Sequence, residues 1–216
     1  GYEQIARLEH VALERAMSRW GQNPAIDILG EADPDRRIGI VAFNILDPEG
    51  DILHPRLVTT LLNDLFGIQS RAGCSCAGPY GHELLGIDAA QSEVIRAAVL
   101  DGEAGLRPGW CRVSLHWVME PEEVTYLIDA VEFLSTHGWR FAELYVFDTV
   151  RGAWKWRGTT SSGPVCFPEV LLADTLAEPL AESCDRTACF VAALASARSL
   201  AQGLETAGSG EALQPA

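Results

Sequence analysis

Apolar residues recur every three or four positions in several stretches of the chain, which is the period of a helix with one buried face. The first such stretch covers residues 2–20. A second begins at Pro55, where a proline fits the first turn of a helix, and Gly67 marks its end. Further helices are predicted at residues 92–100 and at residues 121–138, each followed or closed by a glycine.

Shorter apolar runs between these stretches predict strands. Residues 26–29 form one such run, and residues 38–46 are β-branched and apolar on both alternating faces, as in a strand covered on both sides. A short strand at 68–71 leads into a predicted loop at 72–82. The run 111–118 alternates, so Val113, Leu115 and Trp117 share one face and Arg112, Ser114 and His116 share the other.

This order of elements predicts an α+β fold, in which helices cover a small, largely antiparallel or mixed sheet. We expect the packed domain to span residues 1–140, followed by an added β-hairpin at 141–158. Residues 159–216 are predicted to hold a linker, a possible Ala-rich helix at 186–204 and a disordered acidic tail.

Composition narrows the function classes. The chain has 216 residues, of which 48% are hydrophobic, and a net charge of −14, which argues against nucleic-acid binding. Its apolar runs are far shorter than the roughly 20 residues that cross a bilayer, and no signal-like segment opens the chain, so we expect a cytoplasmic protein without a membrane partner. The start at Gly1, directly in a helix, suggests a fragment. The six scattered cysteines are expected to be free thiols.

One loop combines a basic residue with two cysteines. A thiol acts as a nucleophile only as the thiolate, so it needs access and a nearby positive charge, which Arg71 and a loop position would provide. Cys74 and Cys76 can equally be ordinary small residues in a turn. A zinc site is disfavoured, because this spacing is tight and no second ligand pair follows. The segment is Arg71-Ala72-Gly73-Cys74-Ser75-Cys76-Ala77-Gly78-Pro79.

This segment resembles the persulfide-forming loop of the cysteine desulfurase and selenocysteine lyase branch of the class V aminotransferases, whose pattern is Arg-[Thr/Ala]-Gly-x-x-Cys-Ala-x-Pro. Flanking segments resemble the same family in the same order: the strand ending in Phe43-Asn44, the helix start His54-Pro55, and the strand that carries Arg112. The resemblance covers about residues 1–138. Cys74 and Ser75 stand where relatives often have histidines.

The resemblance implies the C-terminal small domain of a fold-type-I enzyme dependent on pyridoxal 5'-phosphate (PLP). Cys76 takes the position of the nucleophile. Arg112 takes that of the arginine that clamps the substrate carboxylate, assisted by Arg71, and a guanidinium suits this role because it can donate two parallel hydrogen bonds. The implied reaction removes sulfur or selenium from L-cysteine or selenocysteine and gives alanine.

The same resemblance implies what the chain lacks. Relatives hold PLP as a Schiff base on a lysine of a large N-terminal domain, whereas the one lysine here, Lys155, is expected to be a solvated hairpin residue. PLP is therefore expected in the complete enzyme and not on this chain alone. A homodimer and a sulfur acceptor protein are the implied partners, besides the small amino-acid substrate.

Alternatives stay open at the level of sequence. From spacing alone, Arg112 can be a surface arginine in a salt bridge, and His116 is better explained as a packing residue. Another class V transaminase, epimerase or lyase would share the fold and Arg112 but would not use Cys76. A catalytically silent binding module that kept only the small domain is the alternative from a different class.

Overall fold

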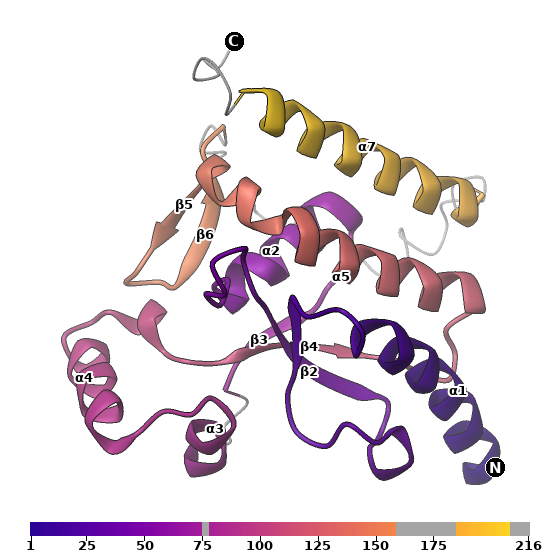
Figure 1. Cartoon of the computed structure of the whole chain (residues 1–216), viewed down its shortest axis with the longest axis horizontal. Coiled ribbons are helices and arrows are strands. Elements are labelled where there is room, and N and C mark those ends of the chain that lie inside the picture. Colours follow the sequence, from indigo (N-terminus) through magenta and orange to yellow (C-terminus); the bar gives the residue numbers. More distant parts are fainter. Residues whose placement is uncertain (75–77, 159–184, 208–216) are drawn as a thin grey trace, which may run out of the picture.

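The computed structural model describes residues 1–74, 78–158 and 185–207, and their elements are those of an α+β protein, as predicted (Figure 1). The helices are α1 (Tyr2–Trp20), α2 (Pro55–Phe66), α3 (Gly78–Leu84), α4 (Ala89–Leu100), α5 (Pro121–Phe141) and α7 (Arg186–Ala207). The strands are β1 (Ile26–Ile28), β2 (Ile40–Ile45), β3 (Arg71–Gly73), β4 (Trp110–Ser114), β5 (Tyr145–Asp148) and β6 (Ala153–Trp156). Short 3₁₀ turns are η1 (Pro34–Arg36), η2 (Ala104–Leu106) and η3 (Ala142–Leu144).

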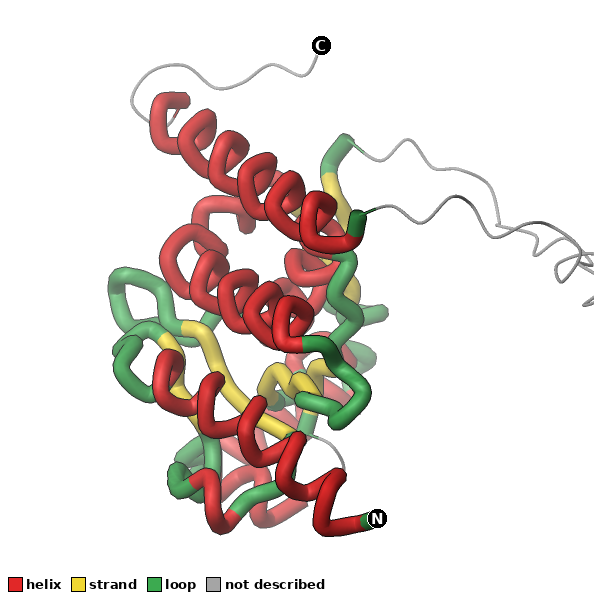
Figure 2. The backbone as a smooth tube through the Cα atoms, turned by 90° about the vertical axis from the view of Figure 1, so that its right-hand side faces the viewer, coloured by secondary structure: helices red, strands yellow, loops and turns green. Residues whose placement is uncertain are grey.

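Four strands form an antiparallel sheet in the order β1-β2-β4-β3, which confirms the predicted sheet type. Helices α1, α2 and α5 lie on one side of this sheet, and α7 lies over α5 (Figures 1 and 2). Alternation along β2 sends Val41, Phe43 and Ile45 into the core that these helices cover, and each of these side chains is fully buried. The apolar pattern of β2 therefore reflects its central position in the sheet.

Large aromatic side chains fix the helices on the sheet. The ring of Trp20, at the end of α1, lies 5.8 Å from that of Phe43, and its indole N–H donates to the carbonyl of Ile128 in α5. Across the same layer, Arg19 binds the carboxylates of Asp129 and Glu132. Burial on this scale is the main source of stability, since a buried aromatic side chain contributes about 3–5 kcal/mol when tested by truncation to alanine.

The hairpin and the last helix join this core. Tyr145 of β5 is buried, as are Leu194, Ala197 and Ala201 of α7, and Phe190 stacks on Tyr126 of α5 at 4.1 Å. The helix predicted at 186–204 is thus confirmed. Residues 159–184 and 208–216, where the sequence predicted the linker and the end of the tail, lie outside the described residues.

The prediction that Gly138 ends the helix begun at Pro121 is wrong. Helix α5 continues through Gly138 to Phe141, because its buried face runs on from Leu134 through Gly138 to Phe141 at helical spacing. The first hairpin strand consequently begins at Tyr145 and not at residue 141.

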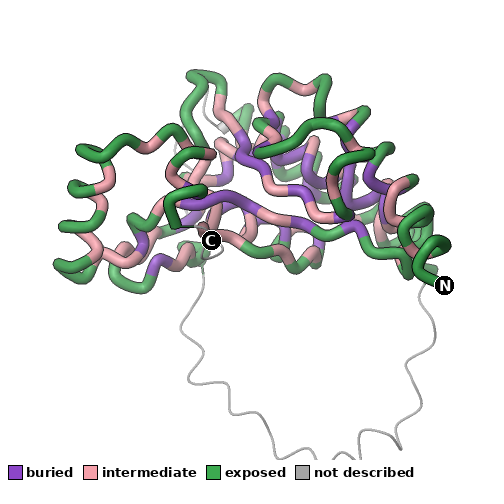
Figure 3. The backbone as a smooth tube through the Cα atoms, turned by 90° about the horizontal axis from the view of Figure 1, so that it is seen from below, coloured by how far each residue is buried: buried purple, intermediate pink, exposed green. Residues whose placement is uncertain are grey.

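Several predicted boundaries shift around the candidate loop. Strand β3 begins at Arg71, where the predicted strand ended, and the predicted loop 72–82 contains the start of α3. Helix α4 begins earlier than predicted, at Ala89, because Asp88 and Gln91 form a reciprocal capping box. Helix α4 has no buried residue, and exposed and intermediate residues dominate this end of the molecule (Figure 3).

Strands β2 and β4 are shorter than the strands predicted at residues 38–46 and 111–118. Strand β2 excludes Ile38, which is exposed, and β4 ends at Ser114, so Trp117 is not on the strand and is 43% exposed. No helix in the described ranges is long and apolar enough to span a bilayer. Cys74 and Cys111 are free thiols, but Cys189 is disulfide-bonded, so the expectation of free thiols is wrong at that residue.

Candidate functional site

The register of the sheet brings Arg71 and Arg112 together. Arg71 of β3 and Ala42 of β2 are the two cross-strand partners of Arg112 in β4. Cα atoms of such partners lie about 4.5–5.5 Å apart, and their side chains project from the same face. Their neighbours Cys111 and Val113 are buried in the helix-covered core, so the two arginines lie on the opposite face. We call Arg71 and Arg112 the arginine pair and this surface the arginine face.

Neither guanidinium of the arginine pair has a hydrogen-bond or ion-pair partner within the described parts of the chain. Most other arginines donate to a carboxylate or a carbonyl, as Arg19, Arg37 and Arg56 do. Like charges placed directly opposite each other destabilise a sheet. In a chain with 30 acidic and 16 basic residues, two adjacent arginines without an acidic partner among the described residues indicate a candidate site for an anion.

The arginine face has further unused hydrogen-bonding capacity. Asn44 lies two residues beyond Ala42 on the same face of β2 and is 2% exposed, and neither its amide oxygen nor its nitrogen finds a partner in the described residues. Trp110 lies two residues before Arg112 on β4 and is also buried. Because a buried polar group without a partner costs about 1–3 kcal/mol, Asn44 is a second polar feature of this face that the core does not explain.

Gly109 holds the start of the candidate loop against the strand that carries Arg112. A Cβ at Gly109 would lie 2.5 Å from Gly73 Cα and 2.8 Å from the backbone nitrogen of Cys74. Only a glycine permits this backbone contact, and Gly73 itself has a positive φ of 125°. The end of β3 and the residue that follows it are therefore fixed by two glycines.

The structure describes Cys74 but not Cys76, the two candidate thiols of this segment. Cys76 lies outside the described residues, so its predicted position as the nucleophile stays a prediction. Cys74 is a free, partly buried thiol at the residue after β3. The described residues hold no cluster of three or more potential metal ligands.

Cys111 can be set aside as a nucleophile. It points into the core from β4, its thiol lies 3.9 Å from the Ser70 hydroxyl, and burial raises its pKa to about 12. At neutral pH it is therefore a neutral thiol without access to solvent.

Two residues that the sequence placed near this chemistry lie elsewhere. His116 is exposed and follows the end of β4, where its Nδ1 accepts a hydrogen bond from the Val118 amide, so it does not share the strand face with Arg112. The prediction of a packing histidine on that strand is corrected accordingly. Lys155 is exposed on β6, in a separate two-stranded sheet, as expected of a hairpin lysine.

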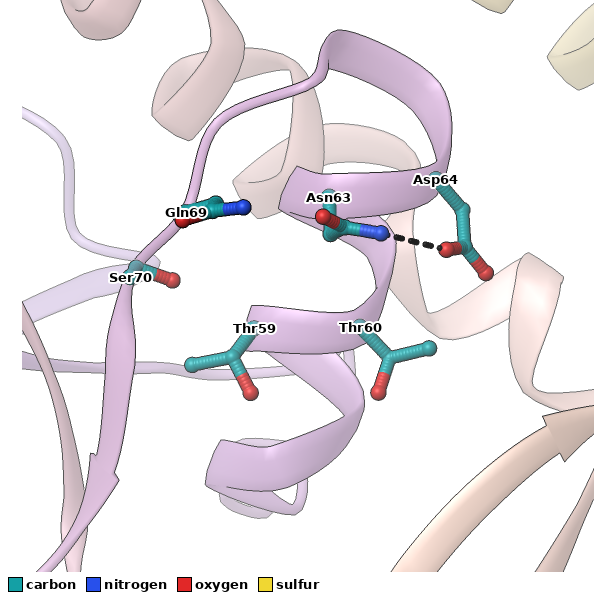
Figure 4. Close-up of a pocket in the computed structure, with 6 residues that line it drawn as sticks. All are labelled: Thr59, Thr60, Asn63, Asp64, Gln69 and Ser70. Carbon is teal, nitrogen blue, oxygen red and sulfur yellow. Dashed lines mark hydrogen bonds between the residues drawn. The ribbon is translucent and has the colours of Figure 1, made fainter. Parts of the chain in front are cut away.

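A polar groove of about 380 Å³ lies beside this region and was not predicted (Figure 4). Its lining residues come from the outer side of α2 and from the segment before β3, and they are Thr59, Thr60, Asn63, Asp64, Gln69 and Ser70. Ser70 contacts Cys111 on the core side of the sheet, so the groove opens on the helix side of the edge strand and not on the arginine face. In the sequence the four of these residues that belong to α2 resemble the solvated stripe of an amphipathic helix.

His54 joins three elements next to the start of α2. Its Nδ1 accepts hydrogen bonds from the Arg56 amide and the Trp154 indole, so its Nε2 carries the proton and donates to the carbonyl of Gly105. Phe147 packs against the imidazole ring in a tilted arrangement, with the ring centroids 4.6 Å apart. Burial lowers the pKa of His54, and the charge of Arg56 lowers it further against the opposing effect of the bond to Gly105.

The lowered pKa of His54 predicts that acid weakens the attachment of the hairpin. As pH falls, His54 takes up its proton in the unfolded chain before it does so in the folded chain. The contribution of neutral His54 to the free energy of unfolding is therefore complete above about pH 6.5 and is lost as pH falls through the pKa of the folded state. We expect the melting temperature to fall more steeply between pH 7 and 5 than in His54→Asn, which keeps an acceptor for the Arg56 amide. The pKa of His137 is also lowered, but His137 is present in both proteins, so its effect on the difference between the two pH profiles cancels. Identical pH profiles would show that His54 does not titrate in this range.

Comparison with known proteins places the chain in a family. The model for "Aminotransferase class-V" matches residues 1–127, so the chain belongs to the class V aminotransferase family, whose members are generally PLP-dependent. The chain is similar to the apo structure of a cysteine desulfurase from Thermococcus onnurineus NA1, with 27% identity and a TM-score of 0.46. That similarity covers 62% of this chain and 27% of the other, so the chain matches about a quarter of that relative. The search of curated proteins found no match.

The residues of this chain do not fit a covalent PLP site. A lysine that forms an imine with the cofactor must be enclosed beside it, whereas Lys155 is exposed. Its neighbour Trp154 is engaged with His54 in attaching the hairpin. The chain therefore offers the arginine pair and two candidate thiols, and not a lysine suited to hold the cofactor.

Proposed function

We propose that this chain is the small-domain part of a PLP-dependent enzyme that removes sulfur or selenium from L-cysteine or selenocysteine and gives alanine. The observation that carries the proposal is the unpaired arginine pair within the segment that matches the family. The sequence of the following loop, which leads from β3 to Cys76, supports the choice of sulfur chemistry within that family.

In this proposal the arginine pair binds the substrate. The planar guanidinium of Arg112 holds the α-carboxylate through two parallel hydrogen bonds, and Arg71, directly opposite, adds a second positive charge. Because neither arginine is engaged by a carboxylate of the described residues, no ion pair among these residues has to break before the substrate binds. The strands hold both side chains on one face, which fixes the direction in which the carboxylate enters.

Cys76 performs the sulfur step. Its thiolate forms a bond to the sulfur of the substrate, the carbon–sulfur bond breaks, and the electron pair stays on carbon. That carbon takes up a proton, so alanine leaves and the sulfur stays on Cys76 as a persulfide. The arginine five residues before Cys76 in the chain favours the thiolate electrostatically.

The remaining parts of the enzyme belong to the proposal as well. PLP, which supplies an electron sink when bound, and its lysine would come from a large N-terminal domain outside this chain. A homodimer in the cytoplasm and a sulfur acceptor protein complete the proposed system.

Arg112→Lys in the complete enzyme is expected to raise the KM for L-cysteine about 10-fold or more, the equivalent of one charge-assisted hydrogen bond of about 1.4 kcal/mol. Lysine keeps the charge but cannot donate two parallel bonds. Alanine and sulfide release would be followed at increasing L-cysteine. Arg107→Lys is the matched control, because Arg107 is an exposed arginine off the sheet with no partner in the described ranges. An unchanged KM in Arg112→Lys would contradict the proposed carboxylate clamp.

A catalytically silent module is the second candidate, and the exposure of Lys155 favours it. Such a module would keep the fold and bind an anion without turning over an amino acid. A coding sequence that continues in frame upstream into a domain with a PLP-binding lysine would exclude it. Absence of a persulfide on Cys76 in an active complete enzyme would instead favour a class V transaminase, epimerase or lyase.

A further inference from the structure

The hairpin formed by β5 and β6 is held against the start of α2. Figure 1 shows its turn directed toward the segment that connects α4 to β4. The guanidinium of Arg56 donates to the carbonyl of Gly152 at 2.6 Å, and the Nδ1 of His54 accepts from the Trp154 indole at 3.3 Å. Because Leu57, the next residue of α2, is buried in the core, these contacts fix the hairpin to a well-packed part of the fold.

Both backbone polar groups of Gly105 in η2 are held at the same junction. Its N–H donates to the carbonyl of Thr149 in the hairpin turn at 2.6 Å, and its carbonyl accepts from His54 Nε2 at 3.2 Å. A Cβ on Gly105 would lie 2.6 Å from the Thr149 carbonyl oxygen and 2.9 Å from Gly152 Cα, so this approach requires a glycine. The preceding helix α4 has no buried residue and does not itself anchor η2 to the core. The hairpin and α2 therefore hold η2 in place.

A short, stiff segment separates this junction from the candidate loop. Gly105 and Gly109 are four positions apart, and Pro108 between them has a fixed φ. Gly109 in turn lies against the backbone of Gly73 and Cys74, where a Cβ would not fit. A displacement of η2 would therefore be transmitted to the end of β3 and to Cys74.

We propose that the hairpin positions the start of the candidate loop, with His54 and Trp154 as positioning residues that act through η2. The hairpin lies outside residues 1–127, which match the family model, so the family match assigns it no role. The catalytic consequence of this inference rests on the proposed function, because the same loop leads to Cys76 and the same strand carries Arg71. The positional effect itself does not depend on that function and can be measured on the full chain.

The rate at which iodoacetamide alkylates Cys74 reports on the start of the loop, and the rate at Cys111 is an internal control. Cys111 is 1% exposed, so it reacts only when the fold opens as a whole. Peptide mass mapping would give both rates. Trp154→Phe keeps an aromatic ring against Phe147 but loses the indole donor. We expect Cys74 to react about 5-fold faster in this variant, as the loss of one hydrogen bond would give, and Cys111 to react at an unchanged rate.

Gly105→Ala perturbs the same link from η2 and should accelerate the alkylation of Cys74 at least as much. Trp156→Phe is the matched control, because Trp156 lies two residues farther along β6 and is 54% exposed; both rates should stay unchanged. In the complete enzyme, Trp154→Phe is expected to lower kcat for sulfur release about 5-fold. The KM for L-cysteine should change less than about 2-fold, because Arg112 is held within β4 by both neighbouring strands.

An unchanged alkylation rate at Cys74 in both variants would overturn the inference, since η2 would then not be linked to the loop. Equal acceleration of Cys74 and Cys111 would also overturn it, because the substitutions would then act by global unfolding. If Cys74 alone is accelerated but the unsubstituted complete enzyme releases no sulfur from L-cysteine, the inference stands and the proposed function fails. If that enzyme releases sulfur and the alkylation rates do not change, the proposed function stands and the inference fails.

Discussion

Cys76→Ser in the complete enzyme is expected to abolish sulfur release from L-cysteine, while substrate binding stays unchanged. A serine hydroxyl has no accessible anion at neutral pH and cannot take over the sulfur, whereas the thiolate of cysteine can. Sulfide and alanine release would be measured together with the substrate affinity of the variant, and mass spectrometry would detect the persulfide on the unchanged enzyme.

Cys74→Ser is the matched control for this experiment. Cys74 is a free thiol in the same loop, but it does not occupy the position of the nucleophile in the family pattern. We expect it to keep most of the activity. If Cys74→Ser is inactive and Cys76→Ser is active, the sulfur is carried by Cys74; if both are active, a class V reaction without a persulfide replaces the desulfurase proposal.

The sequence predicted the elements around the site well, because their signals are local. Periodicity gave α1, α2 and α5, and the glycine after Phe66 gave the end of α2, where Gly67 has the expected left-handed conformation. The alternation in β4 placed Arg112 on the face opposite Val113, and the structure confirms this placement.

The juxtaposition of Arg71 and Arg112 could not be predicted from those signals. They are 41 positions apart in the chain, and their pairing depends on the register between β3 and β4, which no local pattern fixes. The resemblance to a family suggested that both bind substrate, but only the register shows that they are direct partners with no internal counter-ion in the described chain.

The roles of Gly138 and Gly109 could not be predicted, because they depend on contacts that are distant in sequence. Gly138 has the pattern of a helix end, yet it lies buried within α5, beside Leu53. The junction at His54 similarly depends on Trp154, 100 residues away, so a helix start could be predicted there but not the attachment of the hairpin. Each of these features can be recognised only in the tertiary structure.

Gly109→Ala is expected to destabilise the chain by about 3 kcal/mol and to weaken anion binding by the arginine pair. The new Cβ would meet the backbone of Gly73 at 2.5 Å, and a backbone cannot rotate away as a flexible side chain can. The strand β3 would have to move away from the residue before β4, and Arg71 would move with it.

Gly203→Ala is the control for the general effect of replacing glycine. Gly203 lies in α7 with nothing within 4 Å of a built Cβ, so alanine should stabilise the helix by about 0.5–1 kcal/mol. Chemical denaturation would give the two free energies of unfolding, and an NMR titration with L-alanine, the proposed product, would give the affinity. Normal stability and normal affinity in Gly109→Ala would show that β3 has room to adjust. A loss of stability with unchanged affinity would show that the arginine pair does not depend on the contact between Gly109 and Gly73.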